Sequence, residues 1–278
     1  MTGQDLYRIR DFVPEFEVIA AETARRSRAL AVSAAIRRDI AYGGSPREVL
    51  DLIFPDNPAP GAPLHMFIHG GYWRSGEKAD HSCVAAPVLA AGGIAAIVEY
   101  DLMPGTRLGA IVGQVRRAAQ WLASNAASFG ADPARLSVSG HSAGGHLASL
   151  LAATAPGEAS AHLPPITGLM MVSGIYDLSG IPGSFLQHEN RMTPQEARDF
   201  SPLAAHHLPG PHRIIALGQE ETTPFHTQAR ALQAKLADAD ISSELRIEPG
   251  LNHMDVVLAL SDTNHALGAR LQALVSEG

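Results

Sequence analysis

The sequence predicts an α/β fold in which a mostly parallel sheet is covered by helices on both faces. Strand-like and helix-like segments alternate along the 278 residues, and no break in composition divides the chain. The hydrophobic fraction, 46%, is enough for a large core. In the stretch Leu136–Thr154, a short apolar strand leads through a glycine-flanked serine into a small-residue helix. We therefore expect a single domain, residues 1–278, with its site at the carboxyl ends of the strands.

The first 40 residues are expected to form a helical arm. Apolar residues recur at helical spacing between residues 15 and 38, and five arginines form a basic face. Such a helix could pack on the body of the protein or act as a lid over a pocket, and the sequence leaves both interpretations open.

The next elements are read from apolar runs bounded by turn residues. Strands are predicted at residues 40–42, 48–54, 64–68 and 94–100, and helices at residues 84–91 and 108–129. The long helix should stop at Gly130, because glycine is common just past a helix end.

The second half begins with the strand and helix around Ser142, followed by a strand at residues 166–173. An irregular excursion rich in Pro, Gly and His then runs from about residue 179 to 211, with a short capped helix at residues 192–199. Excursions of this length are usually functional, so we expect a small cap over the site. Regular structure then resumes, with strands predicted at residues 213–217 and 242–247 and helices at residues 225–239 and 255–275.

Composition limits the kinds of molecule that the protein is expected to bind. The net charge of -7 and the absence of a basic cluster argue against nucleic acid and anionic membranes, so the expected partner is a small-molecule substrate. The single cysteine, Cys83, excludes an internal disulfide and is expected to be a buried apolar residue. Residues 1–14 lack the features of a signal peptide, and no apolar run approaches ~18 residues, which predicts a cytoplasmic protein. The sequence leaves open whether the chain forms a homodimer.

Residues 140–144 spell G-x-S-x-G, the turn that places a serine hydroxyl at a sharp strand-to-helix corner. Glycines are needed on both sides because a Cβ there would collide with the neighbouring strand and helix. The apolar strand before Ser142 and the periodic helix after it supply the context that the motif requires. Ser142 is therefore the candidate nucleophile, with a plain helix N-cap as the alternative.

A serine nucleophile needs a base that takes its proton and a carboxylate that orients the base. In α/β-hydrolases these follow in the order Ser, acid, His. His253 comes directly after the last predicted strand and is the candidate base. Glu221 is the preferred acid, while Glu220 and Asp177 remain alternatives because they also follow strands.

The oxyanion formed during acyl transfer needs backbone N–H donors. The residue after the nucleophile, Ala143, supplies one, and the HGGYW segment at residues 69–73 is expected to supply others from Gly71 and Tyr72. His69 is expected to brace this loop. The candidates for substrate contact are Gly70, Tyr72, Trp73 and His141. For Trp73, packing beneath the loop is the preferred interpretation, although it is kept among these candidates.

Cofactor and metal motifs are not recognised. The chain has no phosphate-binding loop and no H-E-x-x-H motif, and His206 and His207 are adjacent in a loop. We expect neither a cofactor nor a metal.

HGGYW together with GHSAGG at residues 140–145 resembles the α/β-hydrolase fold kynurenine formamidase (arylformamidase) family, which is related to hormone-sensitive-lipase-type esterases. Further similar segments are SGIYDL at residues 173–178, G-x-x-E-x-x-P-F-x-x-Q at 218–228 and NHMD at 252–255. The resemblance implies Ser142, Glu221 and His253 as nucleophile, acid and base, and it favours Glu221 over Glu220.

The resemblance also implies an activity. It predicts a metal-free serine hydrolase that removes a formyl group from an aromatic amide such as N-formylkynurenine, through an acyl-enzyme. The alternatives are a carboxylesterase acting on small or aryl esters and, in another class, a catalytically inactive binding protein with a hydrolase fold.

Overall fold

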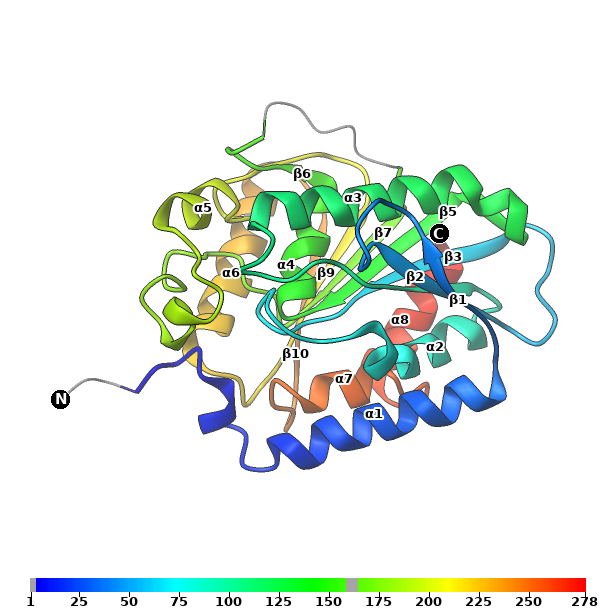
Figure 1. Ribbon diagram of the computed structural model, residues 1–278, viewed down its shortest axis with the longest axis horizontal. Helices are drawn as coiled ribbons and strands as arrows, with labels where there is room; N and C mark the ends of the chain where they lie inside the picture. Colours follow the sequence, from blue (N-terminus) through cyan, green and yellow to red (C-terminus); the bar gives the residue numbers. More distant parts are fainter. Residues whose placement is uncertain (1–3, 159–164) are drawn as a thin grey trace.

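The computed structural model, which describes residues 4–158 and 165–278, has a central sheet with strand order β1-β2-β4-β3-β5-β7-β9-β10 (Figure 1). Its strands are β1 (Ala35–Ala41), β2 (Val49–Phe54), β3 (Ala62–Ile68), β4 (Ile94–Val98), β5 (Ala131–His141), β7 (Gly168–Val172), β9 (His212–Gly218) and β10 (Ser243–Glu248). Strand β2 is antiparallel to both β1 and β4, and all other neighbours in the sheet are parallel. The mostly parallel sheet predicted from the sequence is confirmed. Residues 1–3 of the expected arm lie outside the described residues.

Helices cover both faces of this sheet (Figure 1). Their bounds are α1 (Phe16–Ser33), α2 (Ala85–Ala90), α3 (Leu108–Asn125), α4 (Ala143–Ser149), α5 (Pro194–Asp199), α6 (Thr223–Asp238), α7 (Asp255–Leu260) and α8 (Ala266–Glu277). Buried residues of α3, α4 and α6 share one hydrophobic cluster, whereas those of α2, α7 and α8 share a second. Within the described residues, no helix is long and apolar enough to cross a membrane.

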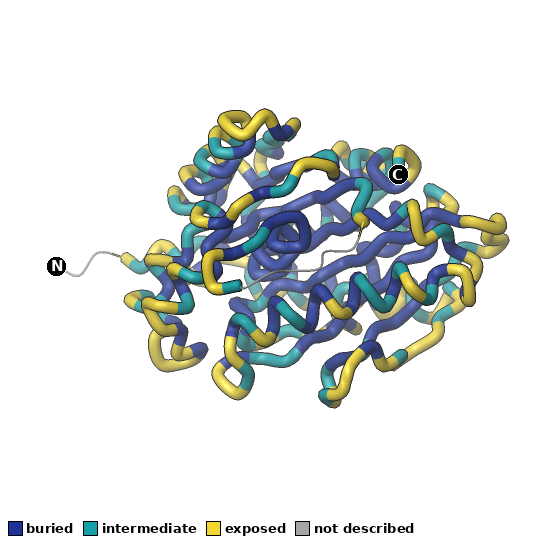
Figure 2. The backbone as a smooth tube through the Cα atoms, turned by 90° about the horizontal axis from the view of Figure 1, so that it is seen from above, coloured by how far each residue is buried: buried dark blue, intermediate teal, exposed yellow. Residues whose placement is uncertain are grey.

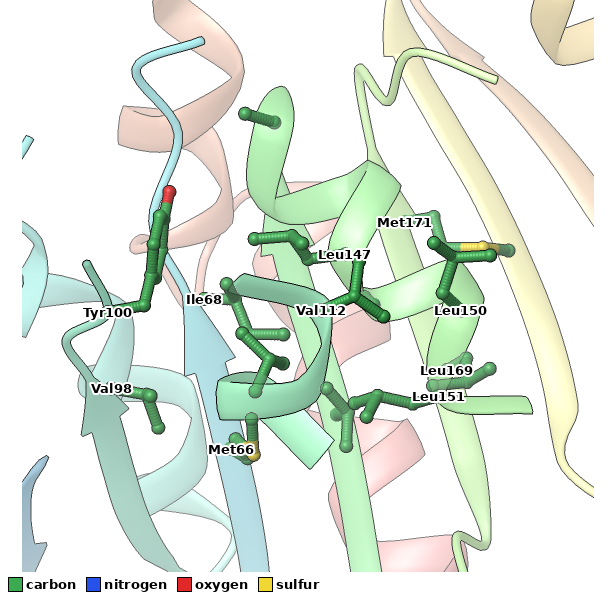
Figure 3. Close-up of a cluster of buried hydrophobic side chains, with 14 of the residues drawn as sticks. Met66, Ile68, Val98, Tyr100, Val112, Leu147, Leu150, Leu151, Leu169 and Met171 are labelled. Carbon is green, nitrogen blue, oxygen red and sulfur yellow. The ribbon is translucent and has the colours of Figure 1, made fainter. Parts of the chain in front are cut away.

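Alternate side chains of strand β3 belong to different hydrophobic clusters. Successive side chains of a strand point to opposite faces. Leu64, Met66 and Ile68 accordingly join the cluster that contains Leu147 of α4, whereas Phe67 joins the other. Figure 3 shows Met66, Ile68 and Leu147 in the first of these clusters. All four are fully buried, and Figure 2 shows the sheet as a buried layer between more exposed helices and loops.

Several predicted features are confirmed. Helix α3 is followed by a 3-10 turn that ends at Gly130, whose φ of 89° is the left-handed conformation expected of a C-terminal glycine. The short helix in the excursion is α5, where Thr193 and Glu196 form a capping box. Cys83 is buried, as expected.

The helix predicted for residues 15–38 was too long. Helix α1 ends at Ser33, and residues 35–41 form β1, which includes residues 40 and 41 of the strand predicted at residues 40–42. Strand β1 lies at the edge of the sheet and pairs only with β2, so all seven of its residues are exposed or half-buried. A polar edge strand lacks the apolar alternation that identifies a half-buried strand, and Arg37 and Arg38 continued the basic pattern of the helix.

The closing helix predicted for residues 255–275 is two helices, α7 and α8. The break falls at residues 261–265, where the Asp262 carboxylate accepts a hydrogen bond from Asn264 N–H and the His265 ring caps α8 by accepting one from Leu267 N–H. Polar side chains that bond to nearby backbone compete with the helix in this way. His265 is therefore a cap and not, as predicted, an interior residue of the last helix.

Candidate active site

The candidate residues gather at one edge of the sheet because they follow strands that run in parallel. Gly70 and Gly71 follow β3, Ser142 follows β5, Glu221 follows β9 and His253 follows β10. The carboxyl ends of parallel strands lie on the same side of a sheet, which is where ligands bind in open α/β folds.

Ser142 occupies the corner between β5 and α4 with φ 56° and ψ -118°, a conformation that is rare for residues other than glycine. Its N–H donates a hydrogen bond to the Val172 carbonyl at 2.9 Å, which ties the corner to β7. Although Ser142 holds the N-cap position of α4, its side chain makes no capping hydrogen bond. The hydroxyl is therefore not used as a cap.

The flanking glycines make this corner sterically allowed. A Cβ on Gly140 would overlap the Gly144 carbonyl of α4, and a Cβ on Gly144 would overlap the Ile68 carbonyl of β3. The collisions are with backbone atoms, which cannot rotate away.

We expect Gly144→Ala to destabilise the protein by about 1–3 kcal/mol and to displace Ser142, because the methyl group must push α4 away from β3. Urea unfolding would measure the loss. Gly113→Ala is the matched control, since a Cβ at this α3 position would meet only Arg117 at 3.5 Å. That change should stabilise by about 0.5–1 kcal/mol. Equal free energies of unfolding for the two variants would contradict this account.

Glu221 and His253 form a buried pair. The Glu221 Oε2 atom lies 2.8 Å from His253 Nδ1, and the exposed fractions of the two side chains are 0% and 5%. A carboxylate accepts, so Nδ1 carries the proton and the Nε2 atom of a neutral ring keeps its lone pair. This is the tautomer that a general base requires.

Two further groups hold the carboxylate. Glu221 Oε1 accepts hydrogen bonds from the Ser173 hydroxyl and from Gly218 N–H. Ser173 is a positioning residue that sequence analysis did not single out, although it begins the SGIYDL segment. The rivals are placed elsewhere: Glu220 is exposed, and the Asp177 carboxylate accepts from Ser179 N–H. Only Glu221 of these three carboxylates pairs with His253 in the structure.

The HGGYW loop approaches the candidate nucleophile closely. A Cβ on Gly70 would lie 3.0 Å from the Ser142 Cβ, so only glycine lets the loop come this near. Gly71, Tyr72 and Trp73 all have positive φ. Among the described residues, none accepts a hydrogen bond from Gly71 N–H or Tyr72 N–H. Ala143 N–H belongs to the first turn of α4, where N–H groups have no intrahelical acceptor.

His69 braces this loop, as expected. Its Nδ1 lies 2.7 Å from the Gly70 carbonyl and its Nε2 lies 2.8 Å from Glu99 Oε1. Both partners can only accept, so this arrangement is satisfied when both ring nitrogens carry protons. Burial raises the pKa of Glu99, but hydrogen bonds from His69 and from Lys78 N–H outweigh burial and leave that pKa below its usual value.

Two adjoining pockets lie over these groups. The inner pocket, of about 180 Å³, is lined by Ser142 and His253 together with Ile9, Phe16, Gly70, Gly71, Tyr72, Gly76, His81, His141 and Met254. The outer pocket, of about 520 Å³, shares Ile9, Phe16, Gly71 and Tyr72 with it and adds Arg8, Arg10, Asp11, Arg74, Ser75, Phe185 and Glu189.

The expected contact residues divide in two groups. Gly70, Tyr72 and His141 line the inner pocket. His141 Nε2 donates to the His253 carbonyl at 2.9 Å, and burial together with the nearby His253 lowers the His141 pKa well below its usual value. Trp73 lines neither pocket, because it is fully buried and donates its indole N–H to His146 Nδ1. The assignment of Trp73 to substrate contact was therefore wrong, and packing beneath the loop is what the structure shows.

The N-terminal arm packs on the body of the protein, and the segment at its start also lines the pockets. Helix α1 packs on the body, where the Ser27 hydroxyl donates to the Asp80 carbonyl. The segment before it reaches the pockets through Ile9 and Phe16. This segment is tied down because Tyr72 donates to the Tyr7 carbonyl and Thr222 to the Leu6 carbonyl.

The excursion at residues 179–211 meets the site only in part. Phe185 and Glu189 line the outer pocket. The following helix, α5, packs instead toward α3, with Arg107 paired to Glu196. The predicted cap is thus limited to a few residues at the rim of the outer pocket.

Comparison with known proteins agrees with this geometry. A candidate thioesterase from Silicibacter has a solved structure that superposes with a TM-score of 0.80 at 24% identity, covering 99% of both chains. An esterase from Pyrobaculum calidifontis superposes with a TM-score of 0.72 at 17% identity, covering 94% of this chain and 92% of its own. The fold is that of the α/β-hydrolases.

Proteins that are similar in sequence are also hydrolases by name. The kynurenine formamidase of Danio rerio is 27% identical over 86% of this chain and 82% of its own length. Esterase LipQ of Mycobacterium tuberculosis is 29% identical over 79% of this chain and 57% of its own length. The protein is therefore a hydrolase of the α/β-hydrolase class, similar to kynurenine formamidases. The BD-FAE family model matches residues 50–236, more than half of the chain, and the chain belongs to that family.

Proposed function

We propose that this hydrolase removes a formyl group from an aromatic amide such as N-formylkynurenine, through an acyl-enzyme on Ser142. The observation that carries the proposal is the buried Glu221–His253 pair, whose His253 lines the same strand-end pocket as Ser142. The name of the Danio rerio relative supports the substrate class.

In the proposed reaction, His253 Nε2 takes the Ser142 hydroxyl proton as the Oγ atom attacks the formyl carbon. The resulting oxyanion accepts hydrogen bonds from the N–H groups of Ala143, Gly71 and Tyr72. His253 then gives the proton to the amine nitrogen, the C–N bond breaks, and the free amine leaves. Water, deprotonated by His253, attacks the formyl ester and releases formate and the serine hydroxyl. Glu221 orients the ring and stabilises its charged form throughout.

The shape and charge of the pockets support a small acyl group and an aromatic leaving group. The inner pocket beside Ser142 has a volume of about 180 Å³, which suits a small acyl group. The outer pocket has aromatic walls from Phe16, Tyr72 and Phe185. Its rim carries cationic and anionic side chains, including the Arg74–Glu189 pair, which suit a leaving group that bears both an ammonium and a carboxylate.

Carboxylesterase activity on small or aryl esters is the second candidate, favoured by the esterases among the relatives. The same three residues would serve both reactions, so kinetics must decide. We would compare kcat/KM of the purified protein on N-formylkynurenine and on p-nitrophenyl acetate. A much higher value on the formamide is expected. Strong ester turnover with negligible formamide turnover would replace the proposal by the second candidate.

A further inference from the structure

His81 is a titratable residue of the inner pocket that the proposed reaction does not use. It belongs to the 3-10 helix Lys78–Val84 and lines the same pocket as Ser142 and His253. Its ring stacks on the His69 ring with centroids 5.8 Å apart and on the Phe67 ring at 6.0 Å. The two stacking contacts hold the ring in a fixed orientation at the pocket wall.

One hydrogen bond sets the tautomer of this ring. His81 Nδ1 lies 3.1 Å from the Glu77 carbonyl, which can only accept, so Nδ1 carries the proton. Burial, assisted by the nearby His69, lowers the pKa of His81 to about 4, and the ring is therefore neutral near pH 7. In a neutral ring with the proton on Nδ1, Nε2 is an acceptor. Among the described residues, none donates a hydrogen bond to it.

The groups around His81 give it no competing donor. His141 lines the same pocket but donates its Nε2 proton to the His253 carbonyl. The two His69 nitrogens are directed at Gly70 and Glu99. The Ser142 hydroxyl is the donor that the proposed reaction assigns to His253. A free acceptor in a pocket of about 180 Å³ is thus available to a bound ligand.

We propose that His81 is a specificity-determining residue whose Nε2 accepts a hydrogen bond from the N–H of the scissile amide. This inference rests on the proposed formamidase function. An anilide carries an N–H beside the scissile carbonyl, whereas the corresponding ester carries an oxygen with no proton. A site built to pair with a donor discriminates against the analogue that lacks it, because the acceptor of the site is then left unpaired. His81 therefore favours amides over esters.

The test uses two substrates, formanilide and phenyl formate, which differ only in N–H against O. His81→Leu should lower kcat/KM for formanilide about tenfold and leave that for phenyl formate within about twofold, which is the size of one hydrogen bond to substrate. His81→Gln restores an acceptor and should recover most of the formanilide activity. His226→Leu is the matched control, because His226 lies on α6 and lines neither pocket. It should leave both rates unchanged.

The outcomes separate this inference from the function on which it rests. Equal losses on both substrates in His81→Leu would show a merely structural role and overturn the inference alone. Failure of His81→Gln to recover formanilide turnover, in a folded protein, would also overturn it. A wild type that hydrolyses phenyl formate but not formanilide would overturn the proposed formamidase function, and the inference with it.

Discussion

Ser142→Ala should reduce kcat/KM on any acyl substrate by roughly 10⁴–10⁶-fold, because alanine has no atom that can form the acyl-enzyme. The rate that remains would come from substrate binding and from the N–H groups that face the oxyanion. Steady-state assays on N-formylkynurenine and p-nitrophenyl acetate would measure the loss.

The loss should arise without unfolding. The Ser142 side chain makes no capping hydrogen bond, and its N–H bond to the Val172 carbonyl does not depend on the side chain. Thermal unfolding of the variant should therefore stay close to that of the wild type. Retention of more than about 1% of the activity would contradict Ser142 as nucleophile.

Glu221→Gln should lower kcat by about 10³–10⁴-fold, the second-largest effect we expect. An amide in place of the carboxylate removes the charge that stabilises protonated His253, and it can present an N–H to Nδ1, which favours the wrong tautomer. Glutamine is nearly the same size, so the cavity that holds the side chain stays filled.

Glu220→Gln and Asp177→Asn are the matched controls for this variant. Neither carboxylate pairs with His253: Glu220 is exposed, and the half-buried Asp177 accepts from Ser179 N–H. Each variant should therefore retain activity within about twofold, because a carboxylate that makes no contact with the site contributes little to it. A large loss in either control, with activity retained in Glu221→Gln, would assign the role of acid to Glu220 or Asp177 instead.

The contacts of Glu221 also show which residues of the site could be predicted from the sequence alone. The order of Ser142, Glu221 and His253 and their positions after strands could be read directly, since parallel strands bring their ends together. Ser173 and His81 could not be found in this way. Their importance depends on distances across the fold, from Ser173 to a carboxylate 48 positions along the chain and from the His81 ring to His69 and the pocket.

The errors in secondary structure have a similar origin. Strand β1 is stabilised by pairing with β2 and has no apolar pattern of its own. Its polar residues were therefore predicted to continue the helix that precedes them. Trp73 was ambiguous because an aromatic residue in a glycine-rich loop can face either a ligand or the core. Its hydrogen bond to His146 of α4 shows that Trp73 faces the core.

The measurement that tests the central claim most directly is peptide mapping by mass spectrometry after treatment with a fluorophosphonate. We expect one adduct, on the peptide that contains Ser142, formed rapidly in the wild type and far more slowly in Glu221→Gln, because His253 must activate the hydroxyl. An adduct on another residue, or none in a folded protein, would contradict a serine hydrolase that acts through Ser142.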